Sequence, residues 1–130
     1  MKNDRFKFRI WDKTRGCFYP NEHGNLHWSL EDTILEEADN DFIQDEMIIE
    51  FCIGIKDKNG TLVFCGDILS WGEALREVCW SDTLASFMLD DYSYDENGKY
   101  TGSGNLETIF VEEIESAEIV GNIHYGVLKK

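Results

Sequence analysis

Apolar residues alternate with polar ones over short stretches of this chain, and several of these stretches end at glycine, proline or aspartate. Such alternation predicts β-strands, because successive side chains of a strand point to opposite faces of the sheet. The predicted strands lie at about residues 5–12, 17–19, 26–30, 47–55, 61–64, 68–71, 75–80, 84–89, 106–111 and 117–123. This pattern favours an all-β, mainly antiparallel fold of serial hairpins with at most one or two short helices, arranged as a small twisted β-barrel or as two packed sheets.

Two stretches also fit helical spacing. Residues 30–38 fit either a short helix or an extended acidic loop, because Ser29 is of a type that caps helices and acidic residues follow it. Residues 72–78 fit either a strand or one to two helical turns. The sequence leaves both alternatives open.

The first predicted strand separates basic from apolar residues. One face carries Arg5, Lys7, Arg9 and Trp11. The opposite face carries Phe6, Phe8 and Ile10. We interpret the basic side as a solvated outer face above a buried inner one, as in an antiparallel sheet with one covered face.

Asn59 and Gly60 stand between two apolar runs and predict a tight hairpin turn, because Asn and Gly adopt the positive φ that such a turn requires. The run that precedes the turn, residues 47–55, has Glu50 as its only charge and is rich in β-branched residues. This composition predicts a central strand that is buried on both faces.

The register of this hairpin depends on the length of its loop. A four-residue loop over residues 57–60 places Cys52 opposite Cys65, whereas a three-residue loop separates the two thiols. The sequence does not decide between the two. Even an opposed pair of thiols falls short of the four ligands of a zinc site, so no metal site is predicted there.

A second hairpin is predicted over residues 92–100. Its Asn97-Gly98 pair lies between tyrosines, and turns of this kind join two strands with few residues. The loop also resembles the opening of a calcium-binding loop, but Gly104 stands where the closing acidic ligand would be required. We therefore expect a projecting hairpin that displays tyrosines.

Several segments resemble those of a known family, in the same order along the chain. They are Lys7–Asp12, the stretch Gly54-Ile-Lys-Asp-Lys-Asn-Gly60 followed by Gly66-Asp67-Ile68, the shorter Val78-Cys79-Trp80, and Glu118–Ile123. Together they are similar to the YopX-like family of phage and prophage proteins, and they span most of the chain. The resemblance implies a phage-encoded, largely β protein. It assigns a catalytic role to none of the residues. Residues 51–53, the acidic segment that precedes them and the stretch 92–104 depart from the family pattern.

The length of 130 residues suits one domain, and we expect a single YopX-like domain over residues 1–130. No apolar run approaches the roughly 20 residues that span a bilayer, and the N-terminus lacks the core of a signal peptide. These features predict a protein of the host cytoplasm that does not bind membranes. The four cysteines form no CxxC pair, so we expect them to be reduced.

The net charge of the chain limits the kinds of molecule that it is expected to bind. The 26 acidic and 12 basic residues give a net charge of −14, and residues 31–50 contain no basic residue. An acidic surface repels phosphate and attracts basic surfaces, so we expect no direct binding to nucleic acid. The predicted acidic surface comprises Glu31, Asp32, Glu36, Glu37, Asp39, Asp41, Asp45 and Glu46.

No motif of an enzyme or a cofactor site is present. His23 and His27 are four residues apart but lie beside Pro20 and Gly24 in a predicted turn, where they would not share the helical face that ligates zinc. The chain has neither a nucleophile elbow nor a His-Glu-x-x-His pair. We predict no catalytic residues, no metal and no cofactor.

The leading hypothesis is a phage accessory protein that binds another protein, with itself and a host protein as candidate partners, and that forms a homo-oligomer. Exposed aromatic residues are efficient anchors of such interfaces. The predicted interface residues are Trp28, Tyr92, Tyr94 and Tyr100, and the predicted turn residues are Asn59, Gly60, Gly66 and Asp67. The alternative is an acidic mimic of nucleic acid that binds a host DNA- or RNA-binding protein, and a small enzyme is a third hypothesis.

Overall fold

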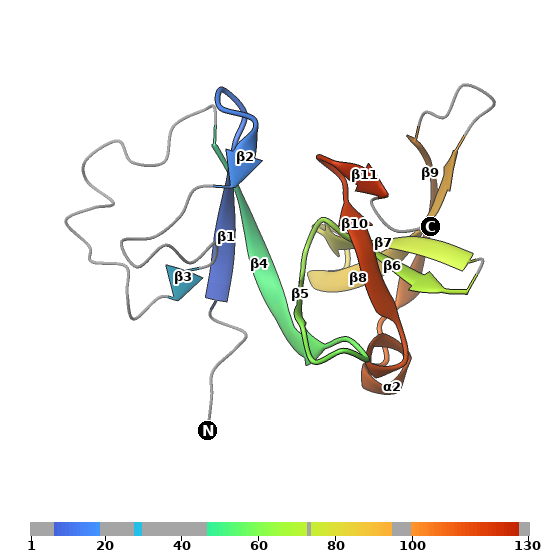
Figure 1. Cartoon of the computed structure of the whole chain (residues 1–130). Helices are drawn as coiled ribbons and strands as arrows, with labels where there is room; N and C mark the ends of the chain where they lie inside the picture. Colours follow the sequence, from blue (N-terminus) through green and yellow to red (C-terminus); the bar gives the residue numbers. More distant parts are fainter. Residues whose placement is uncertain (1–6, 19–27, 30–46, 73, 95–99, 128–130) are drawn as a thin grey trace. The chain divides into compact units, whose positions relative to one another are not determined.

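The computed structural model describes residues 7–18, 28–29, 47–72, 74–94 and 100–127 (Figure 1). Contacts between residues divide the chain into two compact units, residues 1–54 and residues 55–130. The single domain that the sequence predicts stays a prediction. Among the described residues, no helix is long and apolar enough to cross a membrane.

Unit 1 is organised around the first strand. Its strands are β1 (Lys7–Asp12), β2 (Cys17–Phe18), β3 (Trp28–Ser29) and most of β4 (Met47–Lys56). The last two residues of β4 belong to unit 2. β1 pairs antiparallel with each of the other three strands. The strand order of this sheet is β2-β1-β4-β5, where β5 is Leu62–Phe64. β4 therefore has a neighbour on each side, as the sequence predicts for its central strand.

β1 buries residues of both its faces, which corrects the predicted solvated face. Phe8 and Ile10 are buried as expected, but Trp11, on the face that was predicted to be solvated, is only 8% exposed. The indole of Trp11 meets the ring of Phe18 edge-on, with 5.0 Å between ring centroids. The alternation along β1 is as predicted, but the residue types of β1 do not indicate that β2 supplies an aromatic partner, Phe18, on the basic side.

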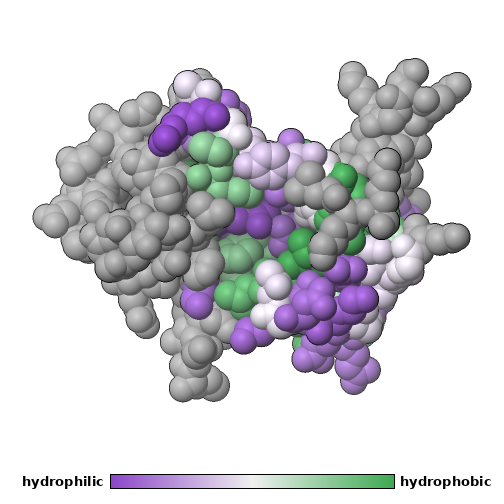
Figure 2. Space-filling model, viewed as in Figure 1, coloured by the Kyte–Doolittle hydropathy of each residue, from purple (hydrophilic) through white to green (hydrophobic). Residues whose placement is uncertain are grey.

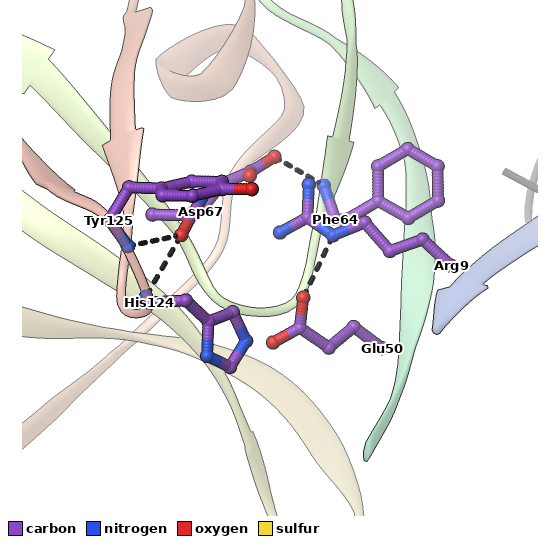
Figure 3. Close-up of polar contacts among 7 residues, drawn as sticks. Arg9, Glu50, Phe64, Asp67, His124 and Tyr125 are labelled. Atoms are coloured by element: carbon purple, nitrogen blue, oxygen red, sulfur yellow. Dashed lines mark hydrogen bonds and ion pairs between the residues drawn. The ribbon is translucent and has the colours of Figure 1, made fainter. Parts of the chain in front are cut away.

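A buried ion pair joins β1 to β4. The Nε–H of Arg9 donates a hydrogen bond of 2.8 Å to Oε1 of Glu50, directly across the strand pair (Figure 3). The side chains of Arg9 and Glu50 are 12% and 4% exposed. The Arg9 guanidinium also lies 4.6 Å from the ring centroid of Phe18. Glu50, the only charge in residues 47–55, is therefore paired. The neighbouring Phe51 is 45% exposed, so β4 is not buried throughout.

The hairpin after β4 has a three-residue loop. The N–H of Asp57 donates to the carbonyl of Thr61, and the N–H of Gly60 donates to the carbonyl of Asp57, so residues 58–60 form the loop. Gly60 has a φ of +82°, whereas Asn59 is not among the residues with positive φ. Asn59 lies in the loop, but the positive φ predicted for it is wrong, because a three-residue loop requires a left-handed residue only at its last position. The longer loop, which would place Cys52 opposite Cys65, is excluded.

Unit 2 contains a second antiparallel sheet. Its strands are β6 (Asp67–Trp71), β7 (Ala74–Ser81), β8 (Ser86–Tyr94), β9 (Tyr100–Thr108), β10 (Glu118–Asn122) and β11 (Gly126–Val127), in the order β11-β10-β6-β7-β8-β9. The core of this unit includes the fully buried Ile68, Leu69, Val78, Leu89 and Ile114. The predicted all-β, mainly antiparallel class with serial hairpins is confirmed.

One short helix, α2 (Val111–Glu115), is the only helix among the described residues. It corrects the strand predicted over residues 106–111, because β9 ends at Thr108 and Val111 is already helical. Glu112 and Glu113 in its first turn suit the positive end of a helix dipole, and Ile114 anchors the helix in the core. The alternative of a helix over residues 72–78 is excluded, because most of that stretch belongs to β7.

Gly66 and Asp67 form the corner between β5 and β6. Gly66 has a φ of +99°, a conformation that favours glycine. Oδ2 of Asp67 accepts a hydrogen bond of 2.8 Å from the N–H of Phe64 (Figure 3). Gly66 also donates its N–H to the carbonyl of Val78 and accepts from the N–H of Ile123. This corner thereby ties strands that are distant in sequence.

Gly121 lies where β10 and β11 approach each other closely. A Cβ there would lie 2.0 Å from the carbonyl oxygen of Gly126 and 2.9 Å from Cα of Val127. These are backbone atoms of the paired β11, which cannot rotate away. We expect Gly121→Ala to lower the free energy of unfolding by about 2 to 3 kcal/mol, measured by urea denaturation.

Gly72 offers a matched control for this prediction. No atom lies within 4 Å of a Cβ built there, but its φ is +75°. Gly72→Ala should therefore lower the free energy of unfolding by only about 1 kcal/mol, because alanine is less stable than glycine in a left-handed conformation. Equal losses for the two variants would contradict a steric role for Gly121.

Candidate protein interface

The structure places the residues that the sequence predicted for an interface in both units. Tyr92 and Tyr94 lie in β8 and Tyr100 in β9, with Tyr94 paired to Tyr100, so the predicted hairpin exists. Its turn, residues 95–99, lies outside the described residues. Trp28 lies in β3, paired with Phe8 in unit 1. The assignment of these four residues to an interface stays a prediction.

The predicted acidic surface and the first two histidines lie outside the described residues. This applies to Glu31, Asp32, Glu36, Glu37, Asp39, Asp41, Asp45, Glu46, His23 and His27. The stretch 30–38, for which the sequence leaves helix and loop open, lies outside them as well. The nucleic-acid mimic therefore stays a hypothesis.

Unit 2 contains an aromatic pair, exposed at Trp80 and partly buried at Phe87, that sequence reasoning did not select. Trp80 in β7 pairs across the strands with Phe87 in β8, and their rings meet edge-on with centroids 5.1 Å apart. Trp80 is nevertheless 50% exposed. Its indole N–H donates a 2.9 Å hydrogen bond to Oδ1 of Asp82, which fixes the ring orientation. An alternating strand predicts which residues share a face, but it does not show where the cover of that face ends.

The turn after Trp80 displays a further apolar side chain. Leu84 is 58% exposed, and its N–H donates to Oγ of Ser81 at 3.1 Å. The next residue, Ala85, has a φ of +51° and is the only residue other than glycine with positive φ among the described residues. This conformation costs an alanine about 1 kcal/mol or more. Leu84 is therefore exposed in a turn whose next residue, Ala85, has a strained backbone conformation.

Phe110 and Val111 add two exposed side chains at the same end of the sheet. Thr108 pairs with Met88, so β9 leaves the sheet beside Phe87, two residues before Phe110. Phe110 and Val111 are 63% and 54% exposed. Phe110 is also the N-cap of α2 and makes no side-chain capping bond, although Ser or Asp at this position stabilises helices. We call Trp80, Leu84, Phe87, Phe110 and Val111 the Trp80 surface.

The surroundings of the Trp80 surface are acidic. No lysine or arginine occurs in residues 77–98 or 101–127, whereas Asp82, Glu112 and Glu115 are exposed there. Figure 2 shows mostly hydrophilic residues over α2. On β7, the guanidinium of Arg76 forms an ion pair with the carboxylate of Glu107, and its Nε lies 3.5 Å from Oδ1 of Asp91. The central carbon of the guanidinium, Cζ, lies 5.7 Å from the ring centroid of Trp71. The charge of Arg76 is thus already matched by two carboxylates.

The described residues provide little for metal chemistry. Among them, no group of three or more His, Cys, Asp or Glu side chains is placed to hold a metal ion. All four cysteines are free thiols, and Cys52 is fully buried. The buried amide of Asn122 serves its own turn, because Oδ1 accepts from the N–H groups of His124 and Tyr125 (Figure 3).

Cys79 gives a prediction that depends on pH. Burial first, and then the nearby carboxylates of Glu77 and Asp90, raise the pKa of this thiol from 9.0 to about 11. A raised pKa keeps the folded thiol protonated where the unfolded thiol ionises, so stability falls between pH 9 and about pH 11. Because only the thiolate is nucleophilic, alkylation of Cys79 by iodoacetamide at about pH 8 should be slower in the folded than in the urea-unfolded chain.

Peptide mass spectrometry would measure the rate of this alkylation across pH. Glu77→Gln should lower the pKa and speed the reaction, because one of the repelling carboxylates is removed. A folded-state rate that equals the unfolded rate at every pH would contradict the prediction.

Comparison with known proteins adds a likeness to solved structures. No family model matches this chain, and no curated protein matches it. Among solved structures, the crystal structure of protein EF1440 from Enterococcus faecalis is similar to this chain at 17% sequence identity and a TM-score of 0.45. The likeness covers 91% of this chain and 92% of that chain. At this TM-score it carries no argument about function.

Proposed function

We propose that this protein is a non-enzymatic, protein-binding β module. The observation that supports the proposal is the Trp80 surface, where Trp80, Leu84, Phe110 and Val111 are each at least half exposed. Exposed aromatic and large aliphatic side chains are typical of interaction sites, and Trp is enriched among the residues that dominate binding energy. The hydrogen bond to Asp82 holds the indole in place, which limits the entropy that binding would cost.

The proposed biological setting is that of a phage or prophage accessory protein acting on a protein of its host. It rests on the resemblance of Lys7–Asp12, Gly54–Gly60 and Glu118–Ile123 to the YopX-like family. The hairpin with Tyr92, Tyr94 and Tyr100 is a second proposed contact region, through which the chain would form a homo-oligomer.

Comparative capture would test the binding function. The chain and its Trp80→Ser/Leu84→Ser variant would each be immobilised and exposed to lysate of phage-infected host cells. We expect at least one host protein to be retained by the original chain and lost by the variant, as quantified by mass spectrometry. An identical set of retained proteins would reject the Trp80 surface as the binding site.

Light scattering would test the self-assembly. The proposed homo-oligomer requires a mass above the 15.1 kDa of one chain. A mass of one chain at every concentration would reject this part of the proposal and leave the binding of other proteins untouched.

A further inference from the structure

The Trp80 surface combines apolar anchors with an excess of negative charge. Its four most exposed side chains are Trp80, Leu84, Phe110 and Val111. The carboxylates of Asp82, Glu112 and Glu115 belong to the same segments, and no lysine or arginine occurs in residues 77–98 or 101–127. A partner must therefore cover apolar side chains and supply positive charge in the same contact.

Self-association through this surface is disfavoured. Two copies would bring two acidic rims together, and opposed like charges at an interface cost several kcal/mol. The net charge of −14 adds to this repulsion at longer range. The occupant that fits is consequently a different molecule, with charge opposite to that of this chain.

The chemistry of the anchors narrows the choice further. The face of an exposed indole attracts ammonium and guanidinium groups, and the long stems of Lys and Arg cover apolar surface while their charged ends reach carboxylates. Unit 2 already contains such a contact, because the guanidinium of Arg76 lies over the ring of Trp71 and binds Glu107. The same chemistry is available at Trp80, beside Asp82.

Local structure at the Trp80 surface departs from what folding alone would favour. Ala85 adopts a left-handed conformation that suits glycine or asparagine better, and the exposed Phe110 occupies an N-cap position that suits serine or aspartate. Such departures cluster at sites that are shaped for function. Ala85 directly follows the exposed Leu84, and Phe110 directly precedes the exposed Val111.

We propose that the Trp80 surface binds a basic amphipathic segment of a partner protein, in which Lys or Arg residues alternate with aliphatic ones. The aliphatic side chains cover Leu84, Phe110 and Val111, and a cationic side chain lies over Trp80. Asp82, Glu112 and Glu115 balance the remaining positive charge. This inference rests on the proposed protein-binding function and names the chemistry of the partner.

Fluorine NMR of the chain labelled with 5-fluorotryptophan provides a direct test. The chain has four tryptophans, and Trp80→Phe assigns the signal of Trp80. The probe is a short peptide of alternating arginine and leucine. We expect it to shift the Trp80 signal saturably, with an affinity that falls as salt rises because the charges are screened. Two control peptides, with serine for leucine and with glutamate for arginine, should bind at least about tenfold more weakly.

Variants locate the binding. Leu84→Ser/Phe110→Ser should weaken binding of the arginine–leucine peptide at least about tenfold. Serine is a favoured N-cap residue, so the variant should not destabilise the helix. Ile123→Ser is the matched control, because Ile123 is 41% exposed but lies after β10, outside the Trp80 surface. We expect this control variant to bind the peptide as the original chain does.

Two results would overturn the inference. The first is that the arginine–leucine peptide does not shift the Trp80 signal. The second is that the peptide with serine in place of leucine binds as tightly as the arginine–leucine peptide, which would show that charge attraction alone accounts for the binding. If host proteins are still captured in a manner that depends on Trp80, the proposed function stands and only the chemistry assigned to the partner fails. If capture also does not depend on Trp80, both fail together.

Discussion

Glu50→Ala is expected to lower the free energy of unfolding of unit 1 by about 3 to 5 kcal/mol. Glu50 is 4% exposed and accepts a 2.8 Å hydrogen bond from the guanidinium of Arg9, which is itself only 12% exposed. Removal of the carboxylate leaves a positive charge in a largely dry environment without this partner, and that is costly. Hydrogen exchange of the β1 and β4 amides, followed by mass spectrometry, would measure the loss.

Two controls separate the buried pair from ordinary surface charge. Arg9→Met/Glu50→Leu removes both charges and replaces them with apolar side chains, so it should lose much less stability than Glu50→Ala. Lys58→Ala breaks a pair with Glu118 whose 3.9 Å separation and exposed lysine predict a loss below about 1 kcal/mol. A Glu50→Ala loss as small as that of Lys58→Ala would contradict the role of the buried pair.

Asp57→Ala should destabilise unit 2 by a similar amount, about 3 to 5 kcal/mol. Asp57 is 6% exposed. Its Oδ1 accepts from the N–H groups of Asn59 and Thr61, both at 2.9 Å, and its Oδ2 accepts from the N–H of Ile119 at 3.1 Å. One carboxylate thus closes the hairpin turn and ties it to β10. Urea denaturation would measure the global loss, and amide exchange at Ile119 would report the local one.

Asp57→Asn and Asn59→Ala are the matched variants for this prediction. The asparagine keeps one oxygen acceptor and loses the charge, so we expect roughly half of the effect of alanine. The side chain of Asn59 makes one long hydrogen bond, 3.4 Å to the carboxylate of Glu118 at the surface, and Asn59→Ala should cost less than about 1 kcal/mol. Equal effects of Asp57→Ala and Asn59→Ala would contradict the central role of Asp57.

The contrast between Asp57 and Asn59 shows which features of the hairpin turn the sequence predicts and which it does not. Asn59-Gly60 located the hairpin correctly, because such dipeptides occur where strands reverse. The loop length was not predictable, since it depends on which residues pair across the strands. The bond from Asp57 to Ile119 joins residues far apart in sequence, and no local pattern contains that information.

The candidate site was less predictable than the fold. Tyrosines of the 92–100 hairpin were selected because they flank a turn, but Trp80 was not selected, because a Trp in an alternating strand suits a core position equally well. Its 50% exposure depends on how the rest of unit 2 packs around β7, which a local pattern does not contain. Phe110 was predicted in a strand, and its place as an exposed N-cap depends on where β9 leaves the sheet.

By itself, the sequence determined the β-strand pattern, most of the reversals and the strongly acidic character, because alternation, turn dipeptides and charge are local properties of the chain. The tertiary structure alone decided that Glu50 is buried with Arg9, that Asp57 holds β10, that Gly121 admits no side chain and that Trp80 lies open beside Leu84. The first two outcomes depend on contacts between residues that are distant along the chain, the third on the close approach of the next strand, β11, and the fourth on how the rest of unit 2 packs around β7. Burial and exposure are set by such contacts, and residue types constrain them only weakly.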